Sequence, residues 1–430
     1  MHNTTYNFLN NKINIDKRII DLIIKCENSL ENEFKNINEI REFNQYKVLN
    51  SMKKNNLSDI HFNASTGYGY GDIGRDTLDN IFADIFNSED ALVRTNIVSG
   101  THALSLCLFG LLEPGDEMLS ITGKPYDTLD EIIGISSQPA GCLKNYNISY
   151  KQIESYNNNE FDFNIIKNSI NSKTKMIFMQ RSAGYNWRKA LTIDEIQQVI
   201  SFIKKIEPNI YCMVDNCYGE FVEFMEPTAV GADIIAGSLI KNPGGSIAPT
   251  GGYIAGKKDL VELAANRLIA PGIGKEGGAT LGFNRLLFQG LFIAPQIVSE
   301  ALKGAILCSK IFDSLGYEVN PLYSSQRSDI VQAIKFRNKE KLVLFCQGIQ
   351  SGSPVDSFVV PEPWDMPGYN EQVIMASGGF VQGSSIELSA DAPMKPPFIG
   401  YLQGGTSYDH VKIGLMHALQ KLMDNQLLSI

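Results

Sequence analysis

Short apolar runs alternate with glycine-rich turns and with helical patterns through the middle of the chain. Six of these runs have the length of one β-strand: "ALVRTNIV", "GDEMLSIT", "KTKMIFMQ", "IYCMVDN", "ADIIAGS" and "GGYIAG". Apolar strands interleaved with helices are typical of a mainly parallel sheet that is covered on both faces. The pattern therefore predicts an α/β fold built on such a sheet.

The two ends of the chain follow other patterns. Apolar residues at helical spacing between residues 16 and 40 predict an N-terminal helical arm. The segment from Gly282 to Gly316 predicts a long helix, or a helix pair, that Pro295 bends or opens and that Gly316 caps. After it we expect strands and then a last helix, in "DIVQAIKF", "KLVLFCQGI", "GSSIELS" and "YDHVKIGLMHALQKLM".

The chain length sets the number of structural parts. A length of 430 residues exceeds the roughly 250–300 residues that one hydrophobic core usually supports. Apolar strand patterns begin near residue 57, and the long helix separates them from the C-terminal strands. We therefore expect three parts: an N-terminal helical arm over 1–56, a large domain over 57–295 and a smaller C-terminal α+β domain over 296–430.

The formal net charge of −9 limits the classes of partner. Nucleic acids and anionic membranes attract basic surfaces, so the charge argues against both and favours a small soluble ligand. The first residues lack the basic and apolar regions of a signal peptide, and no apolar run approaches the ~20 residues that span a bilayer. We expect a cytoplasmic protein.

The cysteines and histidines give no sign of a metal site. Seven cysteines are scattered along the chain, mostly within apolar segments, which favours free buried thiols in a reducing compartment. No CxxC pair is present, and the five histidines form no cluster with cysteine. We therefore expect no metal.

The first candidate for ligand binding is the turn in "VRTNIVSGTHALSLCLFGLL", between an apolar strand and an apolar helix. The amides at the start of a helix bind phosphate, and a glycine such as Gly100 lets the backbone approach closely. An ordinary strand-to-helix turn with Ser99 or Thr101 as the helix cap explains the same pattern equally well. The turn alone does not decide between the two interpretations.

Two further candidates follow apolar strands. Asp215 ends the run "IYCMVDN", at the position where α/β proteins place ligand-contacting groups. Lys241 lies among glycines and prolines in "GSLIKNPGGSIAPTGG", where small neighbours can leave an amine desolvated and nucleophilic. Each has a plain alternative: Asp215 as a helix cap, and Lys241 as a solvated surface lysine.

The three candidates together favour one chemistry. Pyridoxal 5′-phosphate needs an anion site, a carboxylate that keeps its ring nitrogen protonated, and a lysine for the Schiff base. The chain offers these groups in that order. No GxxxxGK[ST] and no GxGxxG lies between a strand and a helix, so a nucleotide-binding loop explains the pattern less well.

The sequence resembles the fold-type I pyridoxal-phosphate enzymes, more narrowly the cystathionine and methionine gamma-lyase group, and most closely the cystathionine beta-lyase-like aluminium resistance family. The resemblance extends over roughly residues 60 to 295 and rests on these segments: "TGYGYGDIGRDTLD", "VSGTHAL", "QRSAGYNWRKALTI", "DNCYGEFVE", "GSLIKNPGG" and "GKEGGATLGFNRLLFQGLF". It implies a large domain with a mainly parallel seven-stranded sheet and a smaller C-terminal α+β domain.

The resemblance also implies roles for single residues. Lys241 would form the Schiff base, and Asp215 would pair with the ring nitrogen. Tyr126 matches the tyrosine that stacks on the cofactor ring. The phosphate contacts would come from the turn and from the hydroxyl three residues before the lysine: Ser99, Gly100, Thr101 and Ser238.

Some positions depart from the family pattern. Ile240 precedes the lysine where gamma-lyases often have a hydroxyl residue. In those enzymes a tyrosine and an arginine two residues apart reach the phosphate of the neighbouring subunit, whereas Tyr70 and Arg75 are five residues apart here. Thr280 lies in a glycine-rich segment that would cross to the neighbour, so the resemblance implies a homodimer or homotetramer with shared sites.

The resemblance implies a carbon–sulfur lyase that acts on a cystathionine, cysteine or methionine type amino acid. Lys241 would move the Cα proton, and Tyr126 or Tyr70 would protonate the leaving sulfur. The substrate carboxylate needs a cation with bidentate geometry, for which the candidates are Arg181, Arg188 and Arg327. The alternatives are an aminotransferase or aldolase on the same scaffold, or a non-catalytic stress-response protein.

Overall fold

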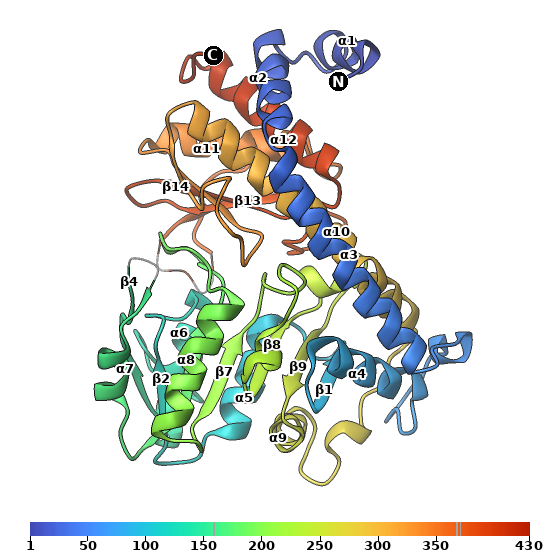
Figure 1. Ribbon diagram of the computed structural model, residues 1–430, viewed down its shortest axis with the longest axis vertical. Coiled ribbons are helices and arrows are strands. Elements are labelled where there is room, and N and C mark those ends of the chain that lie inside the picture. Colours follow the sequence, from blue (N-terminus) through green and yellow to red (C-terminus); the bar gives the residue numbers. More distant parts are fainter. Residues whose placement is uncertain (158–159, 367–368, 370) are drawn as a thin grey trace. The chain divides into compact units, whose positions relative to one another are not determined.

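The computed structural model describes residues 1–157, 160–366, 369 and 371–430 (Figure 1). The chain forms two compact units. The larger unit consists of Glu42–Gly184 and Arg188–Pro295. The smaller unit consists of Met1–Arg41, Tyr185–Trp187 and Gln296–Ile430.

The larger unit is built on a seven-stranded mixed sheet with the order β1-β9-β8-β7-β6-β2-β3. Its strands are β1 (Asp90–Arg94), β2 (Glu117–Ser120), β3 (Ser149–Gln152), β6 (Thr174–Gln180), β7 (Tyr211–Asp215), β8 (Ile234–Ser238) and β9 (Gly252–Gly256). Every neighbouring pair is parallel except those of β9, which runs antiparallel to β1 and to β8. The mainly parallel sheet predicted from the six apolar runs is confirmed.

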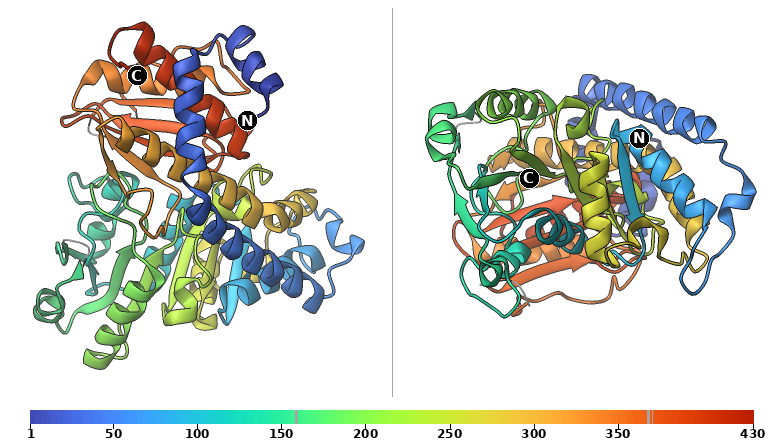
Figure 2. Two further views of the ribbon diagram at one scale, coloured as in Figure 1. Left: turned by 45° about the horizontal axis from the view of Figure 1, so that its top comes forward. Right: turned by 90° about the horizontal axis from the view of Figure 1, so that it is seen from below.

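Both faces of this sheet are buried, which explains why its strands are apolar throughout. Met176 and Phe178 of β6 pack in one cluster with α5 and α9, while Ile177 and Met179 point to the other face, on which α8 lies (Figure 2). The helices of this unit are α4 (Ile73–Phe86), α5 (Gly100–Leu111), α6 (Asp130–Ile133), α7 (Phe163–Ser169), α8 (Ile193–Ile206) and α9 (Lys258–Leu268). β4 (Tyr156–Asn157) pairs antiparallel with β5 (Glu160–Phe161).

The smaller unit contains an antiparallel sheet with the order β10-β11-β14-β13-β12. Its strands are β10 (Glu318–Asn320), β11 (Gln332–Lys335), β12 (Val373–Ser377), β13 (Ser389–Pro393) and β14 (Ile399–Gln403). Its complete helices are α1 (Asn3–Asn11), α2 (Lys17–Asn28), α11 (Lys339–Ser351) and α12 (Tyr408–Asp424). Helices and an antiparallel sheet in one unit form the α+β architecture predicted for the C-terminal part.

Two strand predictions in this unit are wrong. The segment "KLVLFCQGI" belongs to helix α11, where Leu342, Phe345, Cys346 and Ile349 are buried at helical spacing. A short apolar run fits a strand and a buried helix equally well, and the Asn338 cap that starts this helix decides for the helix. The segment "GSSIELS" forms turns up to Leu388, and β13 begins only at its last serine.

Two long helices extend across the unit boundaries, α3 (Glu31–Lys54) and α10 (Asn284–Ser314). The segment that we expected as one helix or two is a single helix, with Pro295 inside it. Its length and composition would allow α10 to cross a membrane, but 72% of its most apolar stretch is buried inside the protein, as in a core helix. All seven cysteines are free and buried, as predicted.

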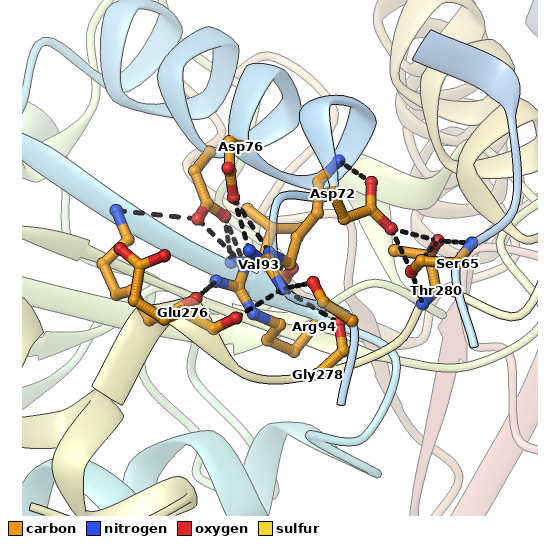
Figure 3. Close-up of polar contacts among 12 residues, drawn as sticks. Ser65, Asp72, Asp76, Val93, Arg94, Glu276, Gly278 and Thr280 are labelled. Atoms are coloured by element: carbon orange, nitrogen blue, oxygen red, sulfur yellow. Dashed lines mark hydrogen bonds and ion pairs between the residues drawn. The ribbon is translucent and has the colours of Figure 1, made fainter. Parts of the chain in front are cut away.

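A buried ion pair joins α4 to β1 in the larger unit. The carboxylate of Asp79 binds the Arg94 guanidinium at 2.7 and 2.9 Å and also accepts a hydrogen bond from the backbone N–H of Val93 (2.8 Å). Arg94 in turn donates to the carbonyl of Lys275 (3.0 Å). Figure 3 shows Val93 and Arg94 in this group of polar contacts, at the edge of the sheet.

Replacing Asp79 by alanine should destabilise the protein by about 3–5 kcal/mol, because the Arg94 guanidinium would stay buried without its carboxylate. Asn80→Ala, at the next and exposed position of α4, should change the free energy of unfolding by no more than about 0.5 kcal/mol. Denaturant unfolding of the two variants measures both values. Equal stability of the two variants would show that the pair does not hold α4 in place.

Candidate active site

Seven of the predicted site residues line one pocket of about 160 Å³ in the larger unit. They are Ser99, Gly100, Thr101, Tyr126, Asp215, Ser238 and Lys241. The pocket lies where β7 and β8 end and α5 begins, which is the usual ligand position of an open α/β sheet. The fold thus brings together side chains that are up to 142 residues apart in the sequence.

The first turn of α5 forms one wall of the pocket. Ser99 caps the helix, since its hydroxyl accepts a hydrogen bond from the N–H of His102 (3.1 Å). A Cβ at Gly100 would lie 3.1 Å from the Cys217 sulfur and 3.4 Å from Cβ of Ser238, so a larger residue would have to displace the pocket wall. Helix capping and anion binding are compatible here, because the amides of a first turn have no partner inside the helix.

Asp215 is the last residue of β7 and is buried. One of its carboxylate oxygens accepts a hydrogen bond from the N–H of Cys217 (3.1 Å). Burial raises the pKa of Asp215, and the positive charge of Lys241 opposes this shift. A carboxylate in this position gains stability from a cationic partner within the pocket.

Lys241 follows β8 by three residues and is half-buried. Its ammonium group lies 4.1 Å from the centre of the Tyr218 ring. Burial lowers the pKa of Lys241, and nearby acidic groups, among them Asp215 and Glu220, raise it. The acidic groups have the larger effect, so the net pKa lies above the ordinary lysine value. The amine therefore needs a partner or reaction that removes its proton before it can act as a nucleophile.

The glycines after Lys241 have a packing role. A Cβ at Gly244 would lie 1.7 Å from the carbonyl oxygen of Leu239, and one at Gly245 would lie 2.3 Å from that of Gly290 in α10. Gly245 also has φ of +55°. Only glycine allows this tight turn, which fixes the backbone of Lys241 against the sheet and α10.

The pocket contains further residues whose role the sequence did not predict. They are Leu104, Thr128, Gln180, Ser182, Cys217, Tyr218 and Ile240. Tyr218 has φ of +72°, which is rare for an aromatic residue and turns its ring toward Lys241. Most of the polar residues in this set lie within the segments "QRSAGYNWRKALTI" and "DNCYGEFVE", on which the family resemblance rests. The sequence by itself does not distinguish a residue that lines the pocket from its neighbours in these segments.

Tyr70, Arg75 and Thr280 lie outside this pocket. Figure 3 shows Thr280 in a cluster of polar contacts with Ser65 and Asp72. Thr280 donates to the carboxylate of Asp72 (2.6 Å), which also binds Ser65. The buried Arg75 guanidinium donates to the carbonyls of Gly69, Glu276 and Gly278 at 2.8 to 3.2 Å.

The Arg75 cluster therefore joins two glycine-rich segments of the same chain. Tyr70 is 60% exposed and stacks on Tyr68, with ring centres 5.5 Å apart. In the described part of one chain, neither Tyr70 nor Arg75 belongs to the wall of the Lys241 pocket.

The three candidate arginines are all bonded within their own units. Arg181 is fully buried and pairs with Glu223 (3.0 Å) and Glu226 (3.3 Å). Arg188 donates to the carbonyls of Gln180 and Ser182, both at 2.8 Å.

Arg327 belongs to the smaller unit, where it donates to the side chain of Gln332 and to two backbone carbonyls. Burial lowers the pKa of Arg327 to about 10. The Arg188 guanidinium is bonded to two residues that line the pocket, Gln180 and Ser182.

The groups in the pocket fit pyridoxal 5′-phosphate. Helix amides and the hydroxyls of Ser99, Thr101 and Ser238 are donors that suit a phosphate. The buried carboxyl of Asp215 suits a protonated ring nitrogen, and the amine of Lys241 suits an aldehyde. The carboxyl of Asp215 is buried, and the protonated ring of this cofactor would place a positive charge next to it.

The comparisons with known proteins agree with this chemistry. The chain is 50% identical to the uncharacterized protein YnbB of Bacillus subtilis over 395 residues, 92% of this chain and 94% of YnbB. A Clostridium novyi structure described as a carbon-sulfur lyase involved in aluminum resistance is 52% identical, with a TM-score of 0.94, and covers 98% of this chain and all of that one. A Clostridium acetobutylicum structure, described as a candidate cystathionine beta-lyase involved in aluminum resistance, has the same identity and coverage and a TM-score of 0.95.

Residues 19–423 match the methionine gamma-lyase family, which is nearly the whole chain. The family, the fold type and the cofactor predicted from the sequence are confirmed. The chain belongs to the methionine gamma-lyase family of pyridoxal 5′-phosphate-dependent enzymes.

Proposed function

We propose that the protein is a carbon–sulfur lyase that releases a thiol from a sulfur amino acid of the cystathionine, cysteine or methionine type. With one water consumed, the products are the thiol, ammonia and a 2-oxo acid. The observation that carries the proposal is the shared pocket of Lys241, Asp215 and the first turn of α5. The names of the two clostridial relatives support carbon–sulfur bond cleavage over the other reactions that this scaffold performs.

The bound cofactor supplies an aldehyde for an amine and a protonated ring that accepts the electron pair left at Cα. Asp215 holds the proton on the ring nitrogen. Lys241 removes the Cα proton of the substrate once its own amine is free, and Tyr126, in the pocket wall, delivers a proton to the leaving sulfur. A second proton transfer at Cβ would allow release from the γ-carbon.

We assign the substrate carboxylate to Arg188 as the first candidate. Its guanidinium is bonded to the backbone of Gln180 and Ser182, so a small movement brings it to the pocket wall. Arg181 would have to leave two buried carboxylates to do so. Arg327 would have to leave the carbonyls of its own unit.

The exposed Tyr68–Tyr70 pair supports an assembly of two or four copies, since exposed aromatic groups favour interfaces. In such an assembly we place Tyr70 and Thr280 at the contact with the neighbouring subunit. We propose the cytoplasm as the compartment, which suits seven free buried thiols.

Lys241→Ala should abolish the covalent capture of the cofactor while leaving the fold intact. The purified wild type should show a visible band near ~420 nm that borohydride fixes to the protein, and the variant should show none that reduction can fix. Mass spectrometry of the reduced proteins places the label on residue 241. A label that remains on the variant protein would exclude Lys241 as the carrier.

The reaction type is tested on the wild type with L-cystathionine, L-cysteine and L-methionine. A lyase should release thiol and 2-oxo acid in equal amounts, whereas an aminotransferase forms 2-oxo acid without thiol.

Asp215→Asn should keep the band that borohydride fixes but slow thiol release by about 10²-fold or more, because the ring nitrogen loses its carboxylate. Unchanged thiol release by Asp215→Asn would remove Asp215 from the mechanism.

A further inference from the structure

Three glutamates follow Asp215 within a short segment that packs behind the pocket: Glu220, Glu223 and Glu226. Glu220 and Glu226 are almost completely buried. Arg181 binds Glu223 (3.0 Å) and Glu226 (3.3 Å), and Lys47 of α3 donates to the carbonyl of Phe224 (3.4 Å) in the same segment. Arg181 thus pairs with two of the three carboxyl groups, and Glu220 and Glu226 are shielded from water.

Glu220 differs from Glu223 and Glu226 in its contacts with cations. In the part of the chain that the structure describes it forms no ion pair, and its oxygen Oε2 is buried with no hydrogen-bond partner. The other oxygen accepts a hydrogen bond from the hydroxyl of Tyr253 in β9 (2.7 Å). An ionised carboxylate with one bare oxygen is costly in such a place, whereas a protonated one is not.

The carboxyl of Glu220 lies directly against the strand that leads to Lys241. A Cβ at Gly237 in β8 would lie 2.6 Å from Oε1 of Glu220. The side chain of Asn242, next to Lys241, donates to the backbone carbonyl of Glu220 (2.9 Å). Asn216, next to Asp215, donates to the Tyr253 hydroxyl (3.3 Å) that binds Glu220. Glu220 is therefore connected to the neighbours of both main pocket groups.

The backbone around Glu220 is held in an unfavourable conformation. Tyr218 has φ of +72° and Phe221 has φ of +62°, and both side chains are bulky. Such conformations persist only where the surrounding structure over-determines them. Here they turn the Tyr218 ring to Lys241 and the Glu220 carboxyl under β8.

We propose that Glu220 is a positioning residue that is held as a neutral carboxylic acid behind the Lys241 pocket. Its neutrality spares Lys241 a further negative charge and so eases the loss of the lysine proton. The proposal rests on the function proposed above for Lys241. Glu220 need not touch substrate or cofactor in this role.

The electrostatics of the region agree with a neutral acid. Burial is the main cause that raises the pKa of Glu220, to about 8, and the negative charge of Glu226 raises it as well. The hydrogen bond from Tyr253 and the positive charge of Lys241 lower the pKa of Glu220. The other groups facing the segment are Asp215, Cys217, Tyr218, Glu223, Arg181 and Lys47. Glu220 is thus protonated below about pH 8 and ionised above it.

The sign of the effect on Lys241 follows. Above about pH 8 the Glu220 carboxyl is ionised, and its negative charge makes Lys241 hold its proton more tightly. Folding is affected in the same window: because the folded pKa exceeds the unfolded one, the stability contributed by the Glu220 proton falls as pH rises to about 8.

The protonation state is tested by infrared spectroscopy on the cofactor-free protein, which makes this test independent of any activity. We expect a carbonyl stretch of a protonated carboxyl group that titrates with a midpoint near pH 8. It should vanish in Glu220→Gln and persist in Glu262→Gln, a matched change at an exposed position of α9. Absence of such a band at pH 6 in the wild type would overturn the proposal.

Two neighbouring variants keep the test decisive even where Glu220→Gln does not fold. Tyr253→Phe removes the hydrogen bond to Glu220 and should move the midpoint to higher pH. Glu226→Gln removes a nearby negative charge and should move it to lower pH. Shifts in the opposite directions, or no shifts, would contradict the assignment of the band to Glu220.

The link to Lys241 is tested on the cofactor-loaded protein through its visible spectrum. Above about pH 8, where the wild-type carboxyl is ionised, Glu220→Gln should lower the proton affinity of the lysine-bound chromophore about tenfold, whereas below that pH the two proteins should not differ, because both side chains are neutral. Glu262→Gln should leave this proton affinity unchanged. Equal proton affinity in the wild type and Glu220→Gln above about pH 8, or a difference below it, would contradict the proposed action of Glu220 on Lys241.

Discussion

Charge that is buried beside Lys241 is the constraint on which the site depends. Asp215, Lys241 and Glu220 lie in one poorly hydrated region, and Arg181 binds two further carboxylates behind it. A buried charge without a partner costs several kcal/mol, so the chain must either pair each group or keep it neutral. Pairing by Arg181 and the proposed protonation of Glu220 are two such solutions, and a bound cofactor with a cationic ring would give Asp215 its partner.

Close packing is the second requirement, because these groups must stay in place while protons move. Glycines provide it at the points where backbones nearly touch. Gly100 brings the start of α5 against Cys217, and Gly244 lets the turn after Lys241 fold back onto Leu239. Gly237 leaves room for the Glu220 carboxyl under β8. A pocket wall made of tightly packed backbone is rigid, and rigidity keeps donors aimed at the ligand without reorganisation.

Arginine has a structural role at several positions in this chain. The guanidinium of Arg75 is bonded to three carbonyls, and that of Arg327 to two carbonyls and a glutamine. Five N–H donors in a fixed plane make arginine suitable for fixing irregular backbone that has no strand or helix partner. Arg75 thereby connects the glycine-rich segment of Tyr70 to that of Thr280.

The sequence alone determined the fold class and the family, because short apolar strands and the quoted segments can be recognised along the chain. It also predicted the pair Asp215 and Lys241, of which Asp215 ends β7 and Lys241 lies three residues after β8. It could not separate a strand from helix α11, since a short apolar run fits both until the capping residue is seen in place. Nor could it show that Arg75, Arg181 and Arg327 are bound to their own chain, or that Glu220 forms no ion pair with any described residue. Those facts depend on which distant groups meet in space and on whether water reaches them, and only the tertiary structure decides both.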